Sequence, residues 1–239
     1  MNKLVVVTGA SSGIGREIAK KLSANNHPVL LLARRIDKME ELNLPNSLCK
    51  SVDVTDLEGM KNAIKEAEEK FGKVDCLVNC AGIMLLGEPQ KQDYKEWSDM
   101  IDVNIKGILT GTNIVLKDMI ERNEGTIINI SSIAGRKTFD NHSVYCGTKF
   151  AVHAITENIR KEVASSNVRV ITIAPGVVET PLLSHTSDED IKANYNEWKK
   201  TIESGLKPEK IASCVEFAYN QPQDVCIREI VIAKTKQED

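Results

Sequence analysis

Three side chains in the second half of the chain have the types and spacing of an acid–base site. Tyr145 and Lys149 are one helical turn apart, so in a helix they share a face. An ammonium group fixed beside a phenol lowers the pKa of the tyrosine, which makes it a usable proton donor and acceptor nearer neutral pH. Ser132 lies thirteen residues earlier, where its hydroxyl can hold a substrate oxygen. A Tyr-x-x-x-Lys pair alone also occurs by chance on surfaces, but this serine closes a predicted strand, where open α/β sheets bind ligands.

A glycine-rich turn near the N-terminus has the composition of a phosphate-binding loop. It follows the apolar run from Leu4 to Val7 and opens a predicted helix. Its glycines suit a tight turn and a close approach of the backbone to a pyrophosphate, and the start of the helix offers free N–H groups. The spacing is G-x-x-x-G-x-G rather than G-x-G-x-x-G, and the alternative is a Gly/Ser loop without a ligand. The candidate cofactor contacts in this turn are Gly9, Ser11, Ser12, Gly13, Ile14 and Gly15.

The end of the second predicted strand indicates which dinucleotide the turn would bind. Arg34 and Arg35 stand where an acidic residue would accept a bond from a ribose 2′-hydroxyl, and the nearest acid, Asp37, comes later. Two guanidinium groups suit a 2′-phosphate, so the pattern favours NADP(H), with a pair of solvated surface arginines as the alternative. Asp53, at the end of the third predicted strand, is expected to bind the adenine edge, to cap a helix, or to do both.

The hydrophobic pattern alternates strands and helices along the chain. Apolar runs predict strands at residues 4–7, 29–33, 48–54, 76–79, 126–130, 168–174 and 225–233. Helices are predicted at about 15–25, 36–42, 57–71, 94–122, 144–163 and 191–202, with a last one opened by Pro208 and ended by Pro222. Thr55 and Glu58 are expected to form the capping box of the third helix, and Gly72 to end it. We therefore expect one domain, residues 1–239, with a Rossmann-like, doubly wound α/β fold: a seven-stranded parallel sheet in a three-layer sandwich.

Charge and composition exclude several classes of partner. The 239 residues carry 31 basic and 34 acidic side chains, a formal net charge of −3, and 4% aromatic residues. This balance gives no basic footprint for nucleic acid or an anionic membrane, and few platforms for stacking bases. No apolar run is long enough to cross a bilayer, and the N-terminal run is too short for a signal peptide. The six cysteines have no zinc-ligand spacing, so we expect reduced thiols, no metal and a cytoplasmic location.

Further motifs accompany these residues in a fixed order. They are Thr8–Gly15, Asp53-Val54, Asn79-Cys80-Ala81-Gly82, Val103-Asn104, Ile130-Ser131-Ser132, Tyr145-Cys146-Gly147-Thr148-Lys149 and Pro175-Gly176. With these motifs the chain resembles the short-chain dehydrogenase/reductase family over nearly its whole length. The resemblance implies an NADP(H)-dependent oxidoreductase that moves a hydride between nicotinamide and a small secondary alcohol or its ketone. Cys80 departs from the family pattern, where a second Asn or an Ala is usual, and is not expected to remove activity.

The resemblance also implies a role for each matching residue. Tyr145 would be the general acid in reduction and the base in oxidation, and Ser132 would position the substrate oxygen. Lys149 would lower the pKa of Tyr145 and hold the nicotinamide ribose, and Asn104 would hold a water that links Lys149 to solvent. The remaining cofactor contacts would be Val54, Asn79, Ala81, Gly82, Pro175, Gly176, Val178 and Thr180, the last at the carboxamide.

The polar segment after Pro175-Gly176, about residues 177–206, resembles the family's substrate-binding lid. Its apolar and aromatic candidates, which would otherwise form a small core or a subunit contact, are Leu182, Leu183, His185, Tyr195 and Trp198. His185 fits a surface histidine better than a catalyst, because Tyr145 already fills that role. The double arginine, Leu206–Glu209 and Ile230–Ile232 are similar to NADP-dependent 3-hydroxy acid and serine dehydrogenases. Arg136 and Lys137 would then either meet a substrate carboxylate or be solvated loop charges.

Assembly and the type of reaction leave alternatives. Family members commonly form tetramers through their long helices, so a homotetramer or homodimer is expected, and Ile108, Val115 and Met119 fit either a subunit contact or a monomer core. The same cleft can support epimerisation or dehydration through a transient ketone, or bind NADP(H) as a sensor without turnover. The complete set of Asn104, Ser132, Tyr145 and Lys149 argues against the sensor.

Overall fold

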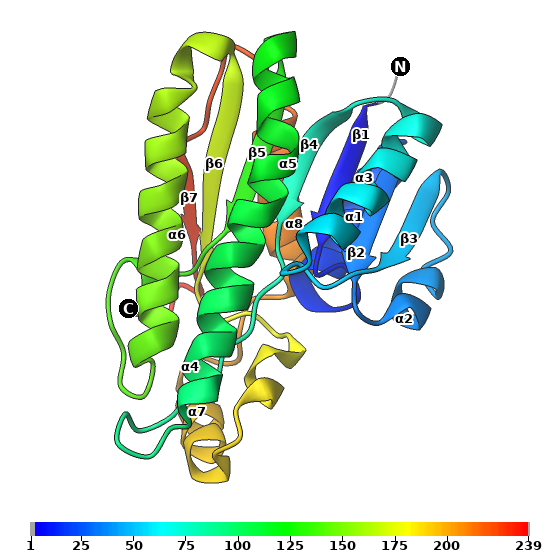
Figure 1. Ribbon diagram of the computed structural model, residues 1–239. Coiled ribbons are helices and arrows are strands. Elements are labelled where there is room, and N and C mark those ends of the chain that lie inside the picture. Colours follow the sequence, from blue (N-terminus) through cyan, green and yellow to red (C-terminus); the bar gives the residue numbers. More distant parts are fainter. Residues whose placement is uncertain (1–2, 239) are drawn as a thin grey trace.

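A parallel β-sheet forms the middle layer of the computed structural model, which describes residues 3–238 (Figure 1). Its strands are β1 (Leu4–Thr8), β2 (Val29–Ala33), β3 (Ser47–Ser51), β4 (Val74–Asn79), β5 (Gly125–Ile130), β6 (Val168–Pro175) and β7 (Glu229–Ile232). They lie in the order β3-β2-β1-β4-β5-β6-β7, and every neighbouring pair is parallel. The order reverses between β1 and β4, and an open α/β sheet binds ligands beyond the carboxyl ends of its strands at such a point.

Helices cover both faces of the sheet. The α-helices are α1 (Gly13–Ala24), α2 (Ile36–Glu40), α3 (Leu57–Phe71), α4 (Tyr94–Ile101), α5 (Gly107–Arg122), α6 (Ser143–Glu162), α7 (Glu189–Thr201) and α8 (Pro208–Tyr219). Shorter turns are the π-helix η1 (Asp102–Lys106) and the 3-10 helices η2 (Ile133–Gly135), η3 (Ala164–Ser166) and η4 (Pro181–His185). The helices α1 and α8 pack on one face, and α3, α5 and α6 pack on the other, so the sheet has an apolar core on each side (Figure 1). None of the helices within residues 3–238 is long and apolar enough to span a membrane.

The three-layer architecture confirms the predicted fold class, and the differences are local. The predicted strand 225–233 is shortened to β7, because the amide of Val225 donates to the carbonyl of Pro222 in a turn instead of joining the sheet. The predicted strand 48–54 ends at Ser51. Beyond it the chain turns toward the carboxyl edge of the sheet.

The predicted capping box of α3 is wrong. Asp56 caps this helix, and its carboxylate accepts from the amide of Gly59 at 3.0 Å. Thr55 instead donates its amide and hydroxyl to Asp53 at 2.9 and 2.7 Å. The acidic side chain one residue later thus caps the helix in place of Thr55. Gly72 does end the helix, with a positive φ of 89°.

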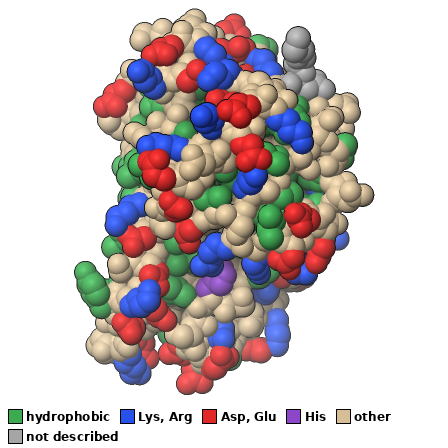
Figure 2. Space-filling model, turned by 45° about the vertical axis from the view of Figure 1, so that its right-hand side comes forward, with side chains coloured by type: hydrophobic (Ala, Val, Ile, Leu, Met, Phe, Trp, Pro, Cys, Tyr) green, Lys and Arg blue, Asp and Glu red, His purple; other side chains and the backbone are tan. Residues whose placement is uncertain are grey.

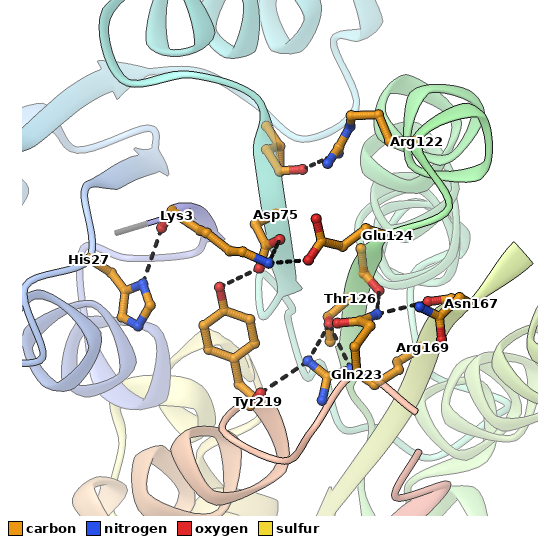
Figure 3. A network of polar contacts seen from close by, with 12 residues as sticks. Lys3, His27, Asp75, Arg122, Glu124, Thr126, Asn167, Arg169, Tyr219 and Gln223 are labelled. Atoms are coloured by element: carbon orange, nitrogen blue, oxygen red, sulfur yellow. Dashed lines mark hydrogen bonds and ion pairs between the residues drawn. The ribbon is translucent and has the colours of Figure 1, made fainter. Parts of the chain in front are cut away.

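A buried polar network joins the strands at the amino end of the sheet (Figure 3). The Tyr219 hydroxyl donates to Asp75 at 2.6 Å, and Lys3 forms an ion pair with the same carboxylate at 3.0 Å. Arg169 donates to the Thr126 hydroxyl at 3.0 and 2.7 Å and to the Tyr219 carbonyl at 3.0 Å. The network therefore ties β4, β5 and β6 to the end of α8 and satisfies charges that are almost completely buried.

The segment 177–206 leaves the sheet, forms η4 and α7 beyond the carboxyl ends of the strands, and returns (Figure 1). Its two ends are joined: the Glu179 amide donates to the Leu206 carbonyl and the Leu206 amide to the Val177 carbonyl, both at 2.8 Å. The Glu179 carboxylate also accepts from the Gly205 amide at 2.6 Å. The two ends of this segment therefore form a fixed base.

Candidate active site

A cavity of about 720 Å³ opens at the carboxyl ends of the strands and extends from the glycine-rich turn to the lid. The predicted site residues that line it are Gly9, Ser11, Ser12, Gly13, Ile14, Gly15, Arg34, Arg35, Asp53, Val54, Ala81, Gly82, Ser132, Tyr145, Lys149, Pro175, Gly176, Val178 and Thr180. The predicted lid side chains Leu182, Leu183, His185, Tyr195 and Trp198 line it too. The structure thus brings together residues from nearly the whole length of the chain.

The glycine-rich turn has a conformation that only glycines fit well. Gly9 and Gly13 have positive φ values of 69° and 53°. A Cβ on Gly9 would lie 2.8 Å from the Ala81 backbone, and one on Gly15 would lie 2.5 Å from the Gly9 carbonyl oxygen. The Ser12 side chain does not cap the start of α1. The first N–H groups of this helix and its positive dipole end therefore face the cavity, as a pyrophosphate requires.

The arginine pair lies beside this turn. The Arg35 guanidinium donates to the hydroxyls of Ser11 and Ser12 at 3.1 and 3.0 Å. Partial burial lowers the pKa of His185, and the nearby charges of Arg34 and Arg35 lower it further. This end of the cavity is therefore electropositive and rich in donors, which suits a phosphate group.

Asp53 marks the neighbouring wall. Its carboxylate accepts both bonds from Thr55, so it shapes the loop between β3 and α3 and does not cap α3. Although partial burial works in the opposite direction, these bonds and the charge of Arg34 hold the pKa of Asp53 below its usual value. A carboxylate that stays ionised at this wall can accept from an exocyclic amino group.

Ser132, Tyr145 and Lys149 meet at the centre of the cavity. Ser132 follows β5, where its hydroxyl accepts from the Ala134 amide at 3.1 Å and lies close enough to the Tyr145 phenol to favour its ionised form. Lys149 lies one turn along α6, with its Nζ 5.8 Å from the centre of the Tyr145 ring. The lysine donates to the carbonyl of Ile130 at 3.0 Å. The end of β5 therefore holds both the serine and the lysine against the tyrosine.

Burial controls the ionisation of this group. Burial raises the pKa of Tyr145 well above its usual value, and the Ser132 hydroxyl only partly opposes this. Burial also lowers the pKa of Lys149 to about 8. The direction of the Tyr145 pKa shift is opposite to the lowering expected from Lys149, because desolvation is the largest influence on the phenol. A neutral phenol in a dry site is set to donate a proton to a developing oxyanion.

Two predicted asparagines do not line the cavity. Asn79 is buried in the sheet, where its amide donates to Asn129 at 2.9 Å, so the expected cofactor contact is wrong. Asn104 lies in the π-helix η1 and is completely buried. It accepts from the Ile83 amide at 2.9 Å and donates to the Ile83 carbonyl at 2.9 Å and the Thr148 hydroxyl at 3.1 Å. Asn104 thus holds the loop after β4 against α6, and its expected role of holding a water near Lys149 stays a prediction.

Three further predictions are settled by side-chain positions. Arg136 lies outside the cavity, where it forms an ion pair with Glu229 at 2.7 Å, and Lys137 also lies outside it. Of the two alternatives left open for this pair, the structure favours loop charges over a contact with a substrate carboxylate. Of the positions left open between a subunit contact and a core, Ile108, Val115 and Met119 are buried inside this chain. They belong to its own core.

Sequence reasoning missed several lining residues. His142 comes from the loop before α6, and its Nδ1 donates to the Asp140 carbonyl at 2.6 Å. Gln237 belongs to a tail that looked merely charged, yet its side-chain oxygen accepts from the Val177 amide at 3.0 Å. Neither residue stands in a pattern with a chemical signature. Only the return of distant segments to the edge of the sheet makes them part of the site.

Comparisons with known proteins agree with this geometry. The family model described as short chain dehydrogenase matches residues 3–191. An oxidoreductase of Staphylococcus saprophyticus is 40% identical, and the match covers 99% of this chain and 97% of that protein. A closed form of serine dehydrogenase complexed with NADP+ superposes with a TM-score of 0.91 at 31% identity, over 99% of this chain and 96% of that one. Serine dehydrogenase from Escherichia coli superposes with a TM-score of 0.85 at 30% identity, over 99% of this chain and 100% of that one.

Proposed function

The chain belongs to the short-chain dehydrogenase family of oxidoreductases, and on this basis we propose that it transfers a hydride between NADP(H) and a secondary alcohol or its ketone. One observation carries the proposal. The cluster of Ser132, Tyr145 and Lys149 lies in the same cavity as the glycine-rich turn and the arginine pair. A dinucleotide that binds this turn would extend along the cavity toward the tyrosine, so cofactor and proton donor would meet there.

The residues that line the adenosine end fit NADP(H). The backbone of the glycine-rich turn and the start of α1 would hold the pyrophosphate, and Arg34 and Arg35 would hold the 2′-phosphate. Asp53 would accept from the adenine amino group. Thr180 at the lid base would meet the carboxamide. Solved structures similar to this chain contain NADP+. When bound, the nicotinamide supplies or accepts the hydride.

The central cluster would handle the proton. In reduction Ser132 would donate to the carbonyl oxygen of the substrate and hold it close to Tyr145. The neutral phenol would pass its proton to this oxygen as negative charge develops, and Lys149 would stabilise the phenolate that remains. In oxidation the same groups would act in reverse. Asn104 would act indirectly, because it positions Ile83 and Thr148 around the cluster.

In this proposal the whole chain, residues 1–239, acts as one domain, and segment 177–206 acts as its lid. We also propose that copies of the chain associate as a dimer or tetramer. Large apolar side chains on α4, α5 and α6 remain about 40% exposed in one copy: Ile101, Leu109, Ile120 and Phe150. Light scattering in solution distinguishes such an assembly from a monomer.

The experiment that tests the reaction replaces Tyr145 with Phe. The variant keeps the ring and its packing but has no proton to give. We expect NADPH binding to stay within about twofold of the unaltered protein, and ketone-dependent NADPH oxidation to fall by about 10²- to 10⁴-fold. The matched control is Tyr94→Phe, because Tyr94 is 77% exposed on α4 and lies outside the cavity.

Each other result has a distinct meaning. Turnover by Tyr145→Phe close to that of the unaltered protein contradicts the assigned role of the tyrosine. Product formed without net consumption of cofactor points to an epimerase or dehydratase that uses the same cleft. Tight NADPH binding with no turnover in the unaltered protein points to a sensor.

A further inference from the structure

The part of the cavity beyond Tyr145 is built from apolar side chains. Buried hydrophobic residues from the loop after β4, from η2 and from α7 pack around the tyrosine, and partly buried ones from the lid join them. Those that also line the cavity include Met84, Leu86, Phe139, Leu182, Ile191 and Tyr195. The Tyr195 ring packs against Trp198 with centroids 5.5 Å apart. A substrate group that enters here leaves water for an apolar and partly aromatic surface.

Each lysine and arginine that lines the cavity within residues 3–238 already has a task elsewhere. Arg34 and Arg35 lie at the adenosine end, beside the glycine-rich turn. Lys149 donates to the carbonyl of Ile130 next to the tyrosine. Lys199, on α7, is the cation on the lid side, and its Nζ forms an ion pair with Glu179 at 3.0 Å. A substrate carboxylate would therefore have to displace Glu179 to gain a cationic partner.

Glu179 is held firmly in that position. Its second oxygen accepts from the Gly205 amide at 2.6 Å, at the base of the lid. The Gly205 amide and, after it, the charge of Lys199 hold the pKa of Glu179 below its usual value despite partial burial. Glu179 therefore stays ionised at neutral pH and neutralises Lys199.

The histidine in the apolar part also disfavours an acid. His142 donates from Nδ1 to the Asp140 carbonyl, so in the neutral ring Nε2 is a hydrogen-bond acceptor. Burial lowers the pKa of His142, which keeps the ring neutral at neutral pH. The ring lies 6.1 Å from that of Tyr145 and 6.3 Å from that of Tyr195. A carboxylate beside it would meet an acceptor and an apolar wall, and burying an unpaired charge is costly.

Resting on the proposed reductase function, we propose that the substrate is an uncharged ketone or secondary alcohol with an apolar or aromatic group, and that carboxylic acids of similar size are rejected. In reduction the carbonyl carbon receives the hydride from NADPH, the π bond breaks, and the oxygen takes the proton from Tyr145. The larger group of the substrate lies among Leu182, Ile191 and Tyr195. The 3-hydroxy acids and serine fall outside this class, although the chain is similar to serine dehydrogenases.

The test measures NADPH oxidation by the purified protein with a matched pair of ketones. Methyl acetoacetate and acetoacetate differ by one methyl group and by the charge that it removes. We expect kcat/KM to be at least about tenfold higher for the ester, because the lysine nearest the apolar part of the cavity, Lys199, is already paired with Glu179. A second pair, 4-phenyl-2-butanone and 2-butanone, tests the apolar wall, and we expect the phenyl compound to react at least about tenfold faster by the same measure.

A variant locates the source of the discrimination. Glu179→Gln keeps an oxygen for the Gly205 amide but loses the charge that neutralises Lys199. We expect the ester-to-acid ratio of kcat/KM to fall by about fivefold or more. The matched control is Glu197→Gln, which breaks an exposed ion pair with Lys200. Both residues lie on α7, as Lys199 does, but outside the cavity. This control should leave the ratio unchanged.

The outcomes separate the two proposals. If kcat/KM of the unaltered protein is equal for acetoacetate and its methyl ester, the proposed substrate class is wrong while the reductase function stands. If it oxidises NADPH with none of the ketones, the proposed reductase function fails and the substrate class falls with it. An equal fall of the ratio in both variants would overturn the role of the Glu179–Lys199 pair.

Discussion

Replacing Lys149 with Met is predicted to make the protein more stable and inactive at the same time. The Lys149 side chain is 6% exposed, and burial lowers its pKa from 10.5 to about 8. This difference means that charging the buried amine costs about 3 kcal/mol more than in the unfolded chain. Met has a similar length and no charge, so it removes this cost. It also removes the bond to the Ile130 carbonyl, a loss of about 1 kcal/mol. The net gain at neutral pH is therefore about 2 kcal/mol.

The stability gained by Lys149→Met should shrink as the pH rises. Between about pH 8 and pH 10.5 the unfolded chain keeps the Lys149 proton while the folded protein releases it. The contribution of Lys149 to the free energy of unfolding of the unaltered protein therefore rises with pH in this window, and the advantage of Lys149→Met shrinks by about 2 kcal/mol between about pH 7 and about pH 9.5. Urea unfolding followed by tryptophan fluorescence measures both values. The control is Lys117→Met, because the Lys117 side chain is 86% exposed. Its free energy of unfolding should stay within about 0.5 kcal/mol of that of the unaltered protein at both pH values.

Two results would refute this reasoning. A Lys149→Met protein less stable than the unaltered one at neutral pH would mean that the ammonium is well solvated or well paired in the folded state. A stability difference that does not change between the two pH values would mean that the pKa of Lys149 is not lowered by burial. Turnover should be lost in either case, because no ammonium remains to stabilise the phenolate.

The remaining predictions concern the two ends of the sheet. Replacing both Arg34 and Arg35 with Ala should raise the Kd for NADPH by about 10- to 100-fold and leave the Kd for NADH nearly unchanged. Fluorescence titration measures both values. An equal loss of affinity for both cofactors would contradict the assignment of the arginines to the 2′-phosphate. Tyr219→Phe should lower the free energy of unfolding by about 1 to 3 kcal/mol, because the buried Asp75 carboxylate loses a bond of 2.6 Å, while kcat stays unchanged. A large fall in kcat without a fall in stability would show that the network in Figure 3 reaches the active site.

The elements that the sequence predicts well are those set by local pattern. The glycine-rich turn needs positive φ at Gly9 and Gly13, so its composition already indicates its conformation. The central strands are apolar on both faces and are therefore visible as continuous runs. The edge strand β7 lacks this signal, since it has one neighbour in the sheet and is half exposed, and its predicted length was wrong.

Side-chain direction is harder to predict than position along the chain. Asn79 and Gly82 belong to one motif, yet Gly82 lines the cavity while the Asn79 side chain lies between the sheet and α5 and donates to Asn129. A Cβ at Gly111 on α5 would lie 2.6 Å from the Asn79 oxygen, so the close packing of this helix, and not the motif, decides where the amide lies. Gln237 shows the converse, because a tail without any pattern reaches the lid base only through the tertiary fold.

Local sequence pattern also does not show how deeply a side chain is buried, which is why the pKa shift of Tyr145 has the opposite direction to the one predicted. The spacing of Tyr145 and Lys149 gives their proximity, and proximity alone favours a lowered tyrosine pKa. Burial depends instead on η2, on α7 and on the loop after β4, which pack around the tyrosine from distant parts of the chain. These segments remove water from both side chains, so each neutral form is favoured and the phenol keeps its proton for the substrate. In the same apolar part of the cavity, the lysine contributed by segment 177–206, Lys199, is already paired with Glu179, so in the proposed site acid–base chemistry and substrate choice have one physical origin.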